Sequence, residues 1–289
     1  MSARSENFLL RRYIEKAMVD LPAMPTTVMR VVRAIEGGEA SASQIEKIIT
    51  ADAAITSKVL KTVNSPYFGM PRTISSVNQA IQILGLNQLR NVTLSIGVLN
   101  ALNTTSPRIQ ALQQQCWEQS FASASAAHRI AVKKGLAKPQ QEAVLIGGLL
   151  HDIGQLFLLT LFNIPYTEVQ TRSKKQCAPL HEVERQVLGT THANLGASLA
   201  ERWSFPSDLV EMIRDHDGDT TSETLNPTVA CVHLADRIVN RIIEPESAEE
   251  IFPLDPKFAE WLAFSDAELT EIVELTMKDM EQAKVAASA

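Results

Sequence analysis

The sequence predicts an all-α fold, and three observations support this prediction. Apolar residues recur at the three- and four-residue spacing of an amphipathic helix through most of the chain. The segments with this spacing are bounded by residues that begin and end helices, such as serine, proline and glycine. No stretch shows the sustained alternation of apolar and polar residues that a strand needs. We therefore expect helices packed on helices and no sheet.

The N-terminal elements are helices with recognisable ends. Ser43 followed by Glu46 predicts a capping box at the start of the segment SASQIEKII. Apolar spacing over residues 55 to 63 predicts the next helix, which stops at the Asn-Ser-Pro of residues 64 to 66 because a proline disfavours helical geometry in the residue before it. The segment SSVNQAIQILG predicts a helix that begins at the serine pair and ends at Gly85, since glycine readily takes the left-handed conformation.

The later elements follow a connection at residues 102 to 108. Pro139 predicts the start of a helix that continues through the His-Asp pair of residues 151 and 152 into the apolar run beyond it. Ser265 and Glu268 predict a second capping box, at the start of a C-terminal helix expected over residues 267 to 284. The apolar stripe of that helix predicts docking onto its own domain, with a homodimer or a partner helix as the alternative.

We expect one domain over residues 20–240 with an extension. Its N-terminal helical part spans residues 1–105, and its second part spans residues 106–243. The segment IIEPESAEEIFPLDPKF, with three prolines and a cluster of acids, separates a C-terminal helical extension assigned to residues 244–289.

Composition and charge exclude several classes of function. The 289 residues are 45% hydrophobic and 21% charged, which is typical of a globular protein. The net charge is −6 and the basic residues form no stripe, so we expect no direct nucleic-acid partner. The three cysteines lie far apart, which predicts a reducing cytoplasm. We find no signal-peptide core and no apolar run of the roughly 18–20 residues that cross a bilayer, so we expect no membrane segment.

The stretch GGLLHDIGQLFLLTLF places a His-Asp pair in an otherwise apolar run. For one such pair alone, a buried hydrogen bond is sufficient explanation. However, other helical segments carry further histidines and carboxylates, and His233 precedes Asp236 by three residues. Imidazole and carboxylate groups are ligands of divalent metals. The set therefore favours a metal centre built from His151, Asp152, His192, His216, Asp217 and Asp236.

The order and spacing of these residues resemble the HD superfamily of metal-dependent phosphohydrolases. More specifically, LPAMPTTVMRVV, IEKIITADAAITSKVLKTVNSPYFG and ISSVNQAIQILGLNQLRNVTLS resemble the N-terminal half of the HDOD family, the HD-related output domains. The segments GGLLHDIGQL, VLGTTHANLGASLAERWSFP and IRDHD resemble its HD-like half. The resemblance implies a multi-helix HDOD fold, in which an N-terminal helical subdomain packs on an HD-like helical core.

The resemblance also implies a metal site with two departures from the catalytic pattern. Catalytic relatives begin the ligand set with a histidine where this sequence has Gln119, and His128 lies nine residues further, on the opposite side of the helix. Asp217 stands where HD-GYP phosphodiesterases have the second of two histidines, and the Gly-Tyr-Pro signature is absent. The implied primary ligands of iron, manganese or nickel are His151, Asp152 and Asp236, with His192, His216 and Asp217 as second-site groups. His128 and His181 are assigned no role.

HDOD proteins are generally regarded as output or scaffolding modules, so we expect a bacterial signalling protein that acts by protein–protein interaction. The expected partner is a histidine kinase or a cyclic-dinucleotide enzyme, and we assign no catalytic residue. The alternatives are a metal-dependent phosphohydrolase or cyclic-nucleotide phosphodiesterase, and a nucleotide sensor without turnover. Gln119 favours the non-catalytic functions. The turn Asn64, Ser65, Pro66 and Tyr67 is interpreted as a helix stop, with contact to a partner as the alternative.

Overall fold

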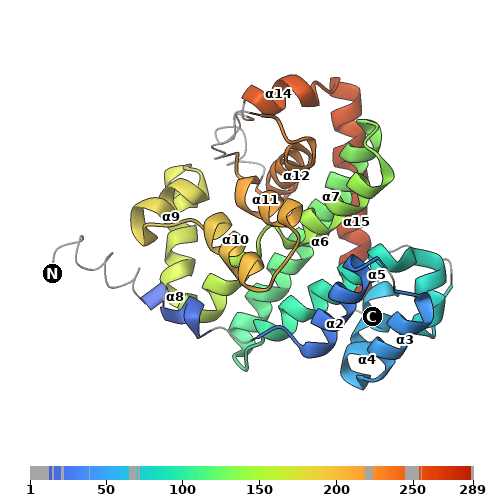
Figure 1. Cartoon of the computed structure of the whole chain (residues 1–289). Helices are drawn as coiled ribbons and strands as arrows, with labels where there is room; N and C mark the ends of the chain where they lie inside the picture. The colour runs from blue at the N-terminus through green and yellow to red at the C-terminus, as the bar shows by residue number, and fades with distance from the viewer. Residues whose placement is uncertain are drawn as a thin grey trace. The chain divides into compact units, whose positions relative to one another are not determined.

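The computed structural model describes residues 13–14, 16–20, 23–38, 40–64, 70, 72–218, 224–244, 254 and 256–287. All regular secondary structure in these residues is helical (Figure 1), which confirms the all-α prediction. The chain divides into two compact units: residues 22–103 with 278–289, and residues 1–21 with 104–277.

The described residues of the segment 22–103 form α2 (Thr26–Glu36), α3 (Ala42–Thr50), α4 (Ala53–Val63) and α5 (Val77–Ala101). Helices α2, α3 and α4 all contact α5, and their buried residues include Val28, Ile45 and Val59. The capping box of α3 is formed by Ser41 and Gln44, so the prediction of Ser43 and Glu46 is wrong by two residues. Ser41 has the extended backbone that an N-cap needs, whereas Ser43 already lies inside the helix.

Asn64 ends α4, as predicted, and ties it to the chain ten residues further on. The Asn64 amide nitrogen donates to the carbonyl oxygens of Leu60 and Ile74, both at 2.8 Å, and its oxygen accepts from the Ile74 backbone nitrogen at 2.7 Å. These bonds give Asn64 a structural role, whereas Ser65, Pro66 and Tyr67 lie outside the described residues. Gly85 has the non-helical angles φ 80° and ψ 168°, so the helix that begins at Val77 ends there, as predicted, and a second helix follows directly across the kink within α5.

The other unit contains the remaining labelled helices. Helices α6, α7 and α12 pack on one another, and α10 contacts both α8 and α11 (Figure 1). The bounds of these helices are α6 (Pro107–Lys133), α7 (Lys138–Leu150), α8 (Ile153–Gln176), α9 (Leu180–Leu188), α10 (His192–Arg202), α11 (Ser207–Asp215), α12 (Pro227–Ile243), α14 (Pro256–Leu262) and α15 (Asp266–Ala287). From Lys278 onward, α15 is assigned to the unit of residues 22–103.

The His-Asp pair lies in a turn between two helices, so the prediction of one continuous helix is wrong. Helix α7 ends at Leu150 and α8 begins at Ile153, while Asp152 has the non-helical angles φ −94° and ψ 17°. The sequence predicts no apolar run long enough to cross a membrane. Lys138–Phe162 is nevertheless long and apolar enough to do so. Its most apolar window is 78% buried inside the protein, which is the pattern of a core segment.

Glycines bring neighbouring helices close to this turn. A Cβ atom on Gly148 of α7 would lie 2.7 Å from Cα of Ala124 in α6. A Cβ atom on Gly154 of α8 would lie 1.9 Å from the carbonyl oxygen of His192 in α10. Since real Cβ atoms do not approach other atoms this closely, only glycine permits these two helix contacts.

The C-terminal helix α15 begins with the predicted capping box. The Ser265 backbone nitrogen donates to the Glu268 carboxylate at 2.9 Å, and the Glu268 backbone nitrogen donates to Oγ of Ser265 at 3.4 Å. Ile272 is fully buried, and Lys133 of α6 forms an ion pair with Glu271 at 2.8 Å. The first part of α15 is therefore docked on its own unit.

Candidate functional site

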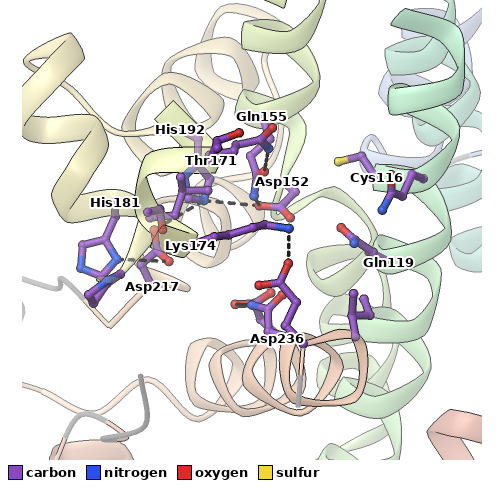
Figure 2. Close-up of a pocket in the computed structure, with 18 of the residues that line it drawn as sticks. Cys116, Gln119, Asp152, Gln155, Thr171, Lys174, His181, His192, Asp217 and Asp236 are labelled. Atoms are coloured by element: carbon purple, nitrogen blue, oxygen red, sulfur yellow. Dashed lines mark hydrogen bonds and ion pairs between the residues drawn. The ribbon is translucent and has the colours of Figure 1, made fainter. Parts of the chain in front are cut away.

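The six candidate ligands come together from four places in one unit, and Figure 2 labels Asp152, His192, Asp217 and Asp236 among them. His151 and Asp152 lie in the α7–α8 turn, and His192 begins α10. His216 and Asp217 follow α11, and Asp236 lies on α12. Within the described part of the chain, two groups of three lie close enough to hold a metal ion: His151, Asp152 and His216, and His192, His216 and Asp217. His216 thus belongs to both groups.

Asp152 lies at the centre of the cluster. Its Oδ2 atom is 3.3 Å from Nε2 of His151, and its Oδ1 atom is 3.3 Å from Nε2 of His192 and 3.7 Å from Nε2 of His216. Asp236 contacts the same His151 nitrogen through Oδ1, at 3.3 Å. Oδ2 of Asp217 lies 3.5 Å from Nε2 of His192. One carboxylate therefore faces three imidazoles.

The three buried imidazoles are oriented with Nε2 toward this centre. Nδ1 of His151 donates to the carbonyl oxygen of Gly148 at 2.8 Å, and Nδ1 of His216 donates to that of Ile213 at 2.8 Å. Nδ1 of His192 donates to a carboxylate at 2.8 Å. When neutral, each ring therefore has its lone pair on Nε2, inside the cluster. The Nε2 atoms of His192 and His216 are only 3.2 Å apart. Two lone pairs repel each other at this distance, so a shared proton or a metal cation between them would be favourable.

Glu184 of α9 orients His192, and the sequence analysis did not identify it. This fully buried carboxylate accepts from both the backbone nitrogen and Nδ1 of His192, each at 2.8 Å, and from the Tyr166 hydroxyl at 2.7 Å. A carboxylate behind a histidine is typical of metal sites, because it fixes the ring and increases its basicity. Glu184 lies on the apolar stripe of α9, with Leu180, Val183 and Leu188, and this position could have revealed it.

Other side chains support the carboxylates. Gln155 donates to Oδ1 of Asp152 at 2.7 Å, and Asn240 donates to Oδ2 of Asp236 at 3.1 Å. Nδ1 of His181, a residue to which the sequence assigned no role, lies 3.5 Å from Oδ1 of Asp217. The sequence contains no spacing that links His181 to the cluster.

His233 and His128 do not join the ligand set. Nδ1 of His233 donates to the backbone carbonyl of His216 at 2.6 Å, and its ring packs on Phe258, with the ring centroids 4.9 Å apart. His128 is half-buried elsewhere on α6, as expected from its helical position relative to Gln119.

The charged groups in the cluster shift one another's pKa values. Burial alone would lower the pKa of His151, but Asp152 and Asp236 outweigh it and raise this pKa well above its usual value. Burial would raise the pKa of Asp152, but His151 and His192 hold it well below its usual value. Burial lowers the pKa of His216. Asp152 therefore stays ionised and requires positive charge nearby, from protonated imidazoles or from a cation.

The residues fit a divalent metal. Oδ2 of Asp217 is buried and accepts no hydrogen bond within the described part of the chain, so a cation would satisfy it. Imidazole nitrogens combined with carboxylate oxygens suit iron, manganese and nickel. Side chains that fix the ligands surround the cluster, as in established metal sites.

A cavity of about 360 Å³ opens onto the cluster. Cys116 and Gln119 of α6 line its wall opposite His192 and Asp217 (Figure 2). Burial raises the pKa of the Cys116 thiol, and the charges of Asp152 and Asp236 raise it further. The Gln119 side chain thus lies at the same cavity as the candidate ligands.

Comparisons with known proteins agree with this architecture. The family model of the HDOD domain matches residues 21–218. An uncharacterized protein of Treponema pallidum (strain Nichols) is 29% identical over 243 residues, which are 81% of this chain and 45% of that protein. The chain thus spans less than half the length of this relative.

Solved structures with similar folds cover nearly the whole chain. An HDOD domain protein of unknown function from Geobacter sulfurreducens has a TM-score of 0.71 at 22% identity, over 99% of this chain and 98% of the other. A candidate phosphohydrolase from Shewanella amazonensis SB2B has a TM-score of 0.70 at 19% identity, over 94% and 97%. A candidate signal transduction protein from Marinobacter aquaeolei VT8 has a TM-score of 0.75 at 17% identity, over 99% and 65%. At these identities the likeness establishes the fold alone.

Proposed function

Because the chain belongs to the HDOD domain family, we propose that it is a bacterial cytoplasmic signalling protein whose HD-like site binds a divalent transition metal and whose output is contact with another protein. The main support for metal binding is that the Nε2 atoms of three histidines converge on Asp152, while the Nδ1 atom of each of these histidines already donates a hydrogen bond. We assign His151, Asp152 and Asp236 to the first ion, with His192, His216 and Asp217 as second-site groups.

The proposed role of the site is binding without rapid turnover. In this superfamily, the metal lowers the pKa of bound water and holds phosphate oxygens. Gln119 offers an amide oxygen where the catalytic pattern has an imidazole, and an amide is a poorer ligand for a transition metal. We therefore expect bound metal and slow or absent hydrolysis.

A second candidate function is phosphohydrolysis. The cavity of about 360 Å³ favours it, because a small substrate could reach the candidate metal ligands from solvent. Phosphate release from nucleotides and cyclic dinucleotides should be measured with manganese, iron or nickel. Turnover of about 1 per second or faster, abolished by His151→Ala, would establish the enzyme instead of the binding module.

Metal analysis of the purified protein tests the site. We expect at least one bound iron, manganese or nickel ion per chain and its loss in Asp152→Asn, because this change removes the charge of the central carboxylate. Asp208→Asn, at an exposed position on α11, is the matched control and should retain the metal. Equal metal content in Asp152→Asn and the control would refute the ligand assignment.

The partner class is tested with purified proteins. A histidine kinase or a cyclic-dinucleotide enzyme from the same bacterium should bind the metal-loaded protein in biolayer interferometry. Dissociation constants measured before and after chelation would show whether the metal controls this contact. Absence of binding to every member of both classes would contradict the proposed output.

A further inference from the structure

Arg237 lies beside the candidate metal centre with most of its binding capacity unused. It follows Asp236 on α12, is 9% exposed and lines the cavity. One guanidinium nitrogen donates to the backbone carbonyl of Asp217 at 3.2 Å, while the buried Nε atom has no partner. Among the described residues, Arg237 forms no ion pair. A buried cation without an anion is unfavourable, and the planar guanidinium matches the oxygens of a phosphate.

Lys174 brings a second cation to the same cavity. It lies near the end of α8, and its ammonium group forms an ion pair with Glu244. In Figure 2 its side chain extends across the cavity between Asp152 and Asp236. The Lys174 side chain is 62% exposed, and exposed ion pairs contribute little to stability. An incoming anion could therefore replace Glu244 as the partner of Lys174.

The metal determines whether an anion can approach. Asp152, Asp217 and Asp236 line the cavity, and their negative charges repel phosphate to the extent that protonated imidazoles do not offset them. A divalent metal would add positive charge beside them, and the cations Lys174, Arg237 and Arg241 that also line the cavity would then favour an anion. Binding of an anion should therefore depend on the metal.

The size and the walls of the cavity restrict the rest of the ligand. A volume of about 360 Å³ is near the lower end of ligand pockets, about 300–1,000 Å³. Within the described residues, no Phe, Tyr or Trp lines the cavity, so a base would not find the large aromatic rings that usually stack on it. Amide side chains are plentiful and can both donate to and accept from hydroxyl groups: Gln115, Gln119, Gln155, Gln170 and Asn240.

We propose that Lys174 and Arg237 bind the phosphate of a small, hydroxyl-rich organic phosphomonoester above the metal centre. This proposal rests on the metal binding proposed above. Arg237 contacts the phosphate oxygens from the α12 side, and Lys174 closes over them from the α8 side. The glutamine and asparagine side chains that line the cavity face the hydroxyl groups of the ligand.

Isothermal titration calorimetry of the metal-loaded protein tests this proposal, with inorganic phosphate, ribose 5-phosphate and a nucleoside 5′-monophosphate as probes. We expect ribose 5-phosphate to bind, and Lys174→Gln to weaken it by about ten-fold, equal to about 1.4 kcal/mol. Lys175→Gln is the matched control, since Lys175 is exposed on the same helix and does not line the cavity. Arg237→Gln should weaken binding by at least as much, with partial recovery in Arg237→Lys.

Metal affinity, measured on the same variants, separates this proposal from a purely structural role. If Arg237 only balances the carboxylates, Arg237→Gln will change metal affinity and leave phosphate affinity unaltered, which overturns the proposal. Retained metal with no binding of any probe also overturns it and leaves the metal centre intact. A wild-type protein without metal refutes both proposals. If the nucleoside monophosphate binds far more tightly than ribose 5-phosphate, the phosphate site is supported and its natural ligand is a nucleotide.

Discussion

Replacement of Glu184 by glutamine should weaken metal binding without unfolding the protein. Glu184 is fully buried, and its Oε2 atom accepts both hydrogen bonds from His192, while its Oε1 atom accepts from Tyr166. Glutamine has nearly the same shape. Its oxygen can keep the two His192 bonds, and the Tyr166 hydroxyl can rotate to accept from its nitrogen. The orientation of the His192 ring is therefore retained, and the charge behind it is lost.

The magnitude follows from the Nδ1 bond of His192. A hydrogen bond to a charged group contributes about 1.5–3 kcal/mol and one to a neutral group about 0.5–1.5 kcal/mol. The loss of charge therefore removes about 1–1.5 kcal/mol of support for the metal-bound imidazole, which is about ten-fold in metal affinity. This agrees with the roughly 10–100-fold effects of residues that support metal ligands.

The assay is a competition titration of manganese or iron(II) under anaerobic conditions, with unfolding followed by circular dichroism. Glu182→Gln is the matched control, because Glu182 is an exposed glutamate on the same helix. We expect about ten-fold weaker binding in Glu184→Gln and no change in Glu182→Gln. Equal affinities in the two folded variants would refute the reasoning that Glu184 supports a metal ligand through His192.

Three further changes test the site and the packing around it. Gln119→His should raise metal affinity about ten-fold in the same titration, because imidazole binds transition metals better than an amide oxygen does; no gain in a folded variant would mean that residue 119 does not reach the metal. Gly148→Ala should lower the free energy of unfolding by about 1–3 kcal/mol or more in urea titration, since its Cβ would lie 2.7 Å from Cα of Ala124; an unchanged midpoint would contradict the tight α6–α7 contact. Asn64→Ala should destabilise by about 1–3 kcal/mol in the same experiment, because the Ile74 backbone groups lose their partner; a stability loss below about 0.5 kcal/mol would show that water replaces the amide.

Local signals in the sequence determined much of the fold. The helical spacing of apolar residues predicted an all-α protein, and the Ser265–Glu268 pair correctly marked the start of α15. Helix periodicity and capping depend on residues within one or two turns, which is why they can be recognised without a tertiary structure. The motifs of both halves also predicted the HDOD family, which the match over residues 21–218 confirms.

The same local signals failed where distant contacts control the backbone. The apolar run around His151 and Asp152 predicted one helix, but the chain turns there. Gly85, by contrast, does break the helical geometry within α5, because its positive φ is a local property of the residue. At the His-Asp pair, the backbone follows packing with other helices, which periodicity along the chain does not report.

The sequence by itself supplied the family, the helices and the types of the six candidate ligands, because each depends on short stretches of chain. Only the tertiary structure brought Glu184 and His181 to those ligands. Both residues come from α9, about 30 residues after His151, and no local spacing connects them with it. Their positions depend on how closely the helices pack, and that packing is set by contacts such as the approach of Gly154 to the His192 backbone.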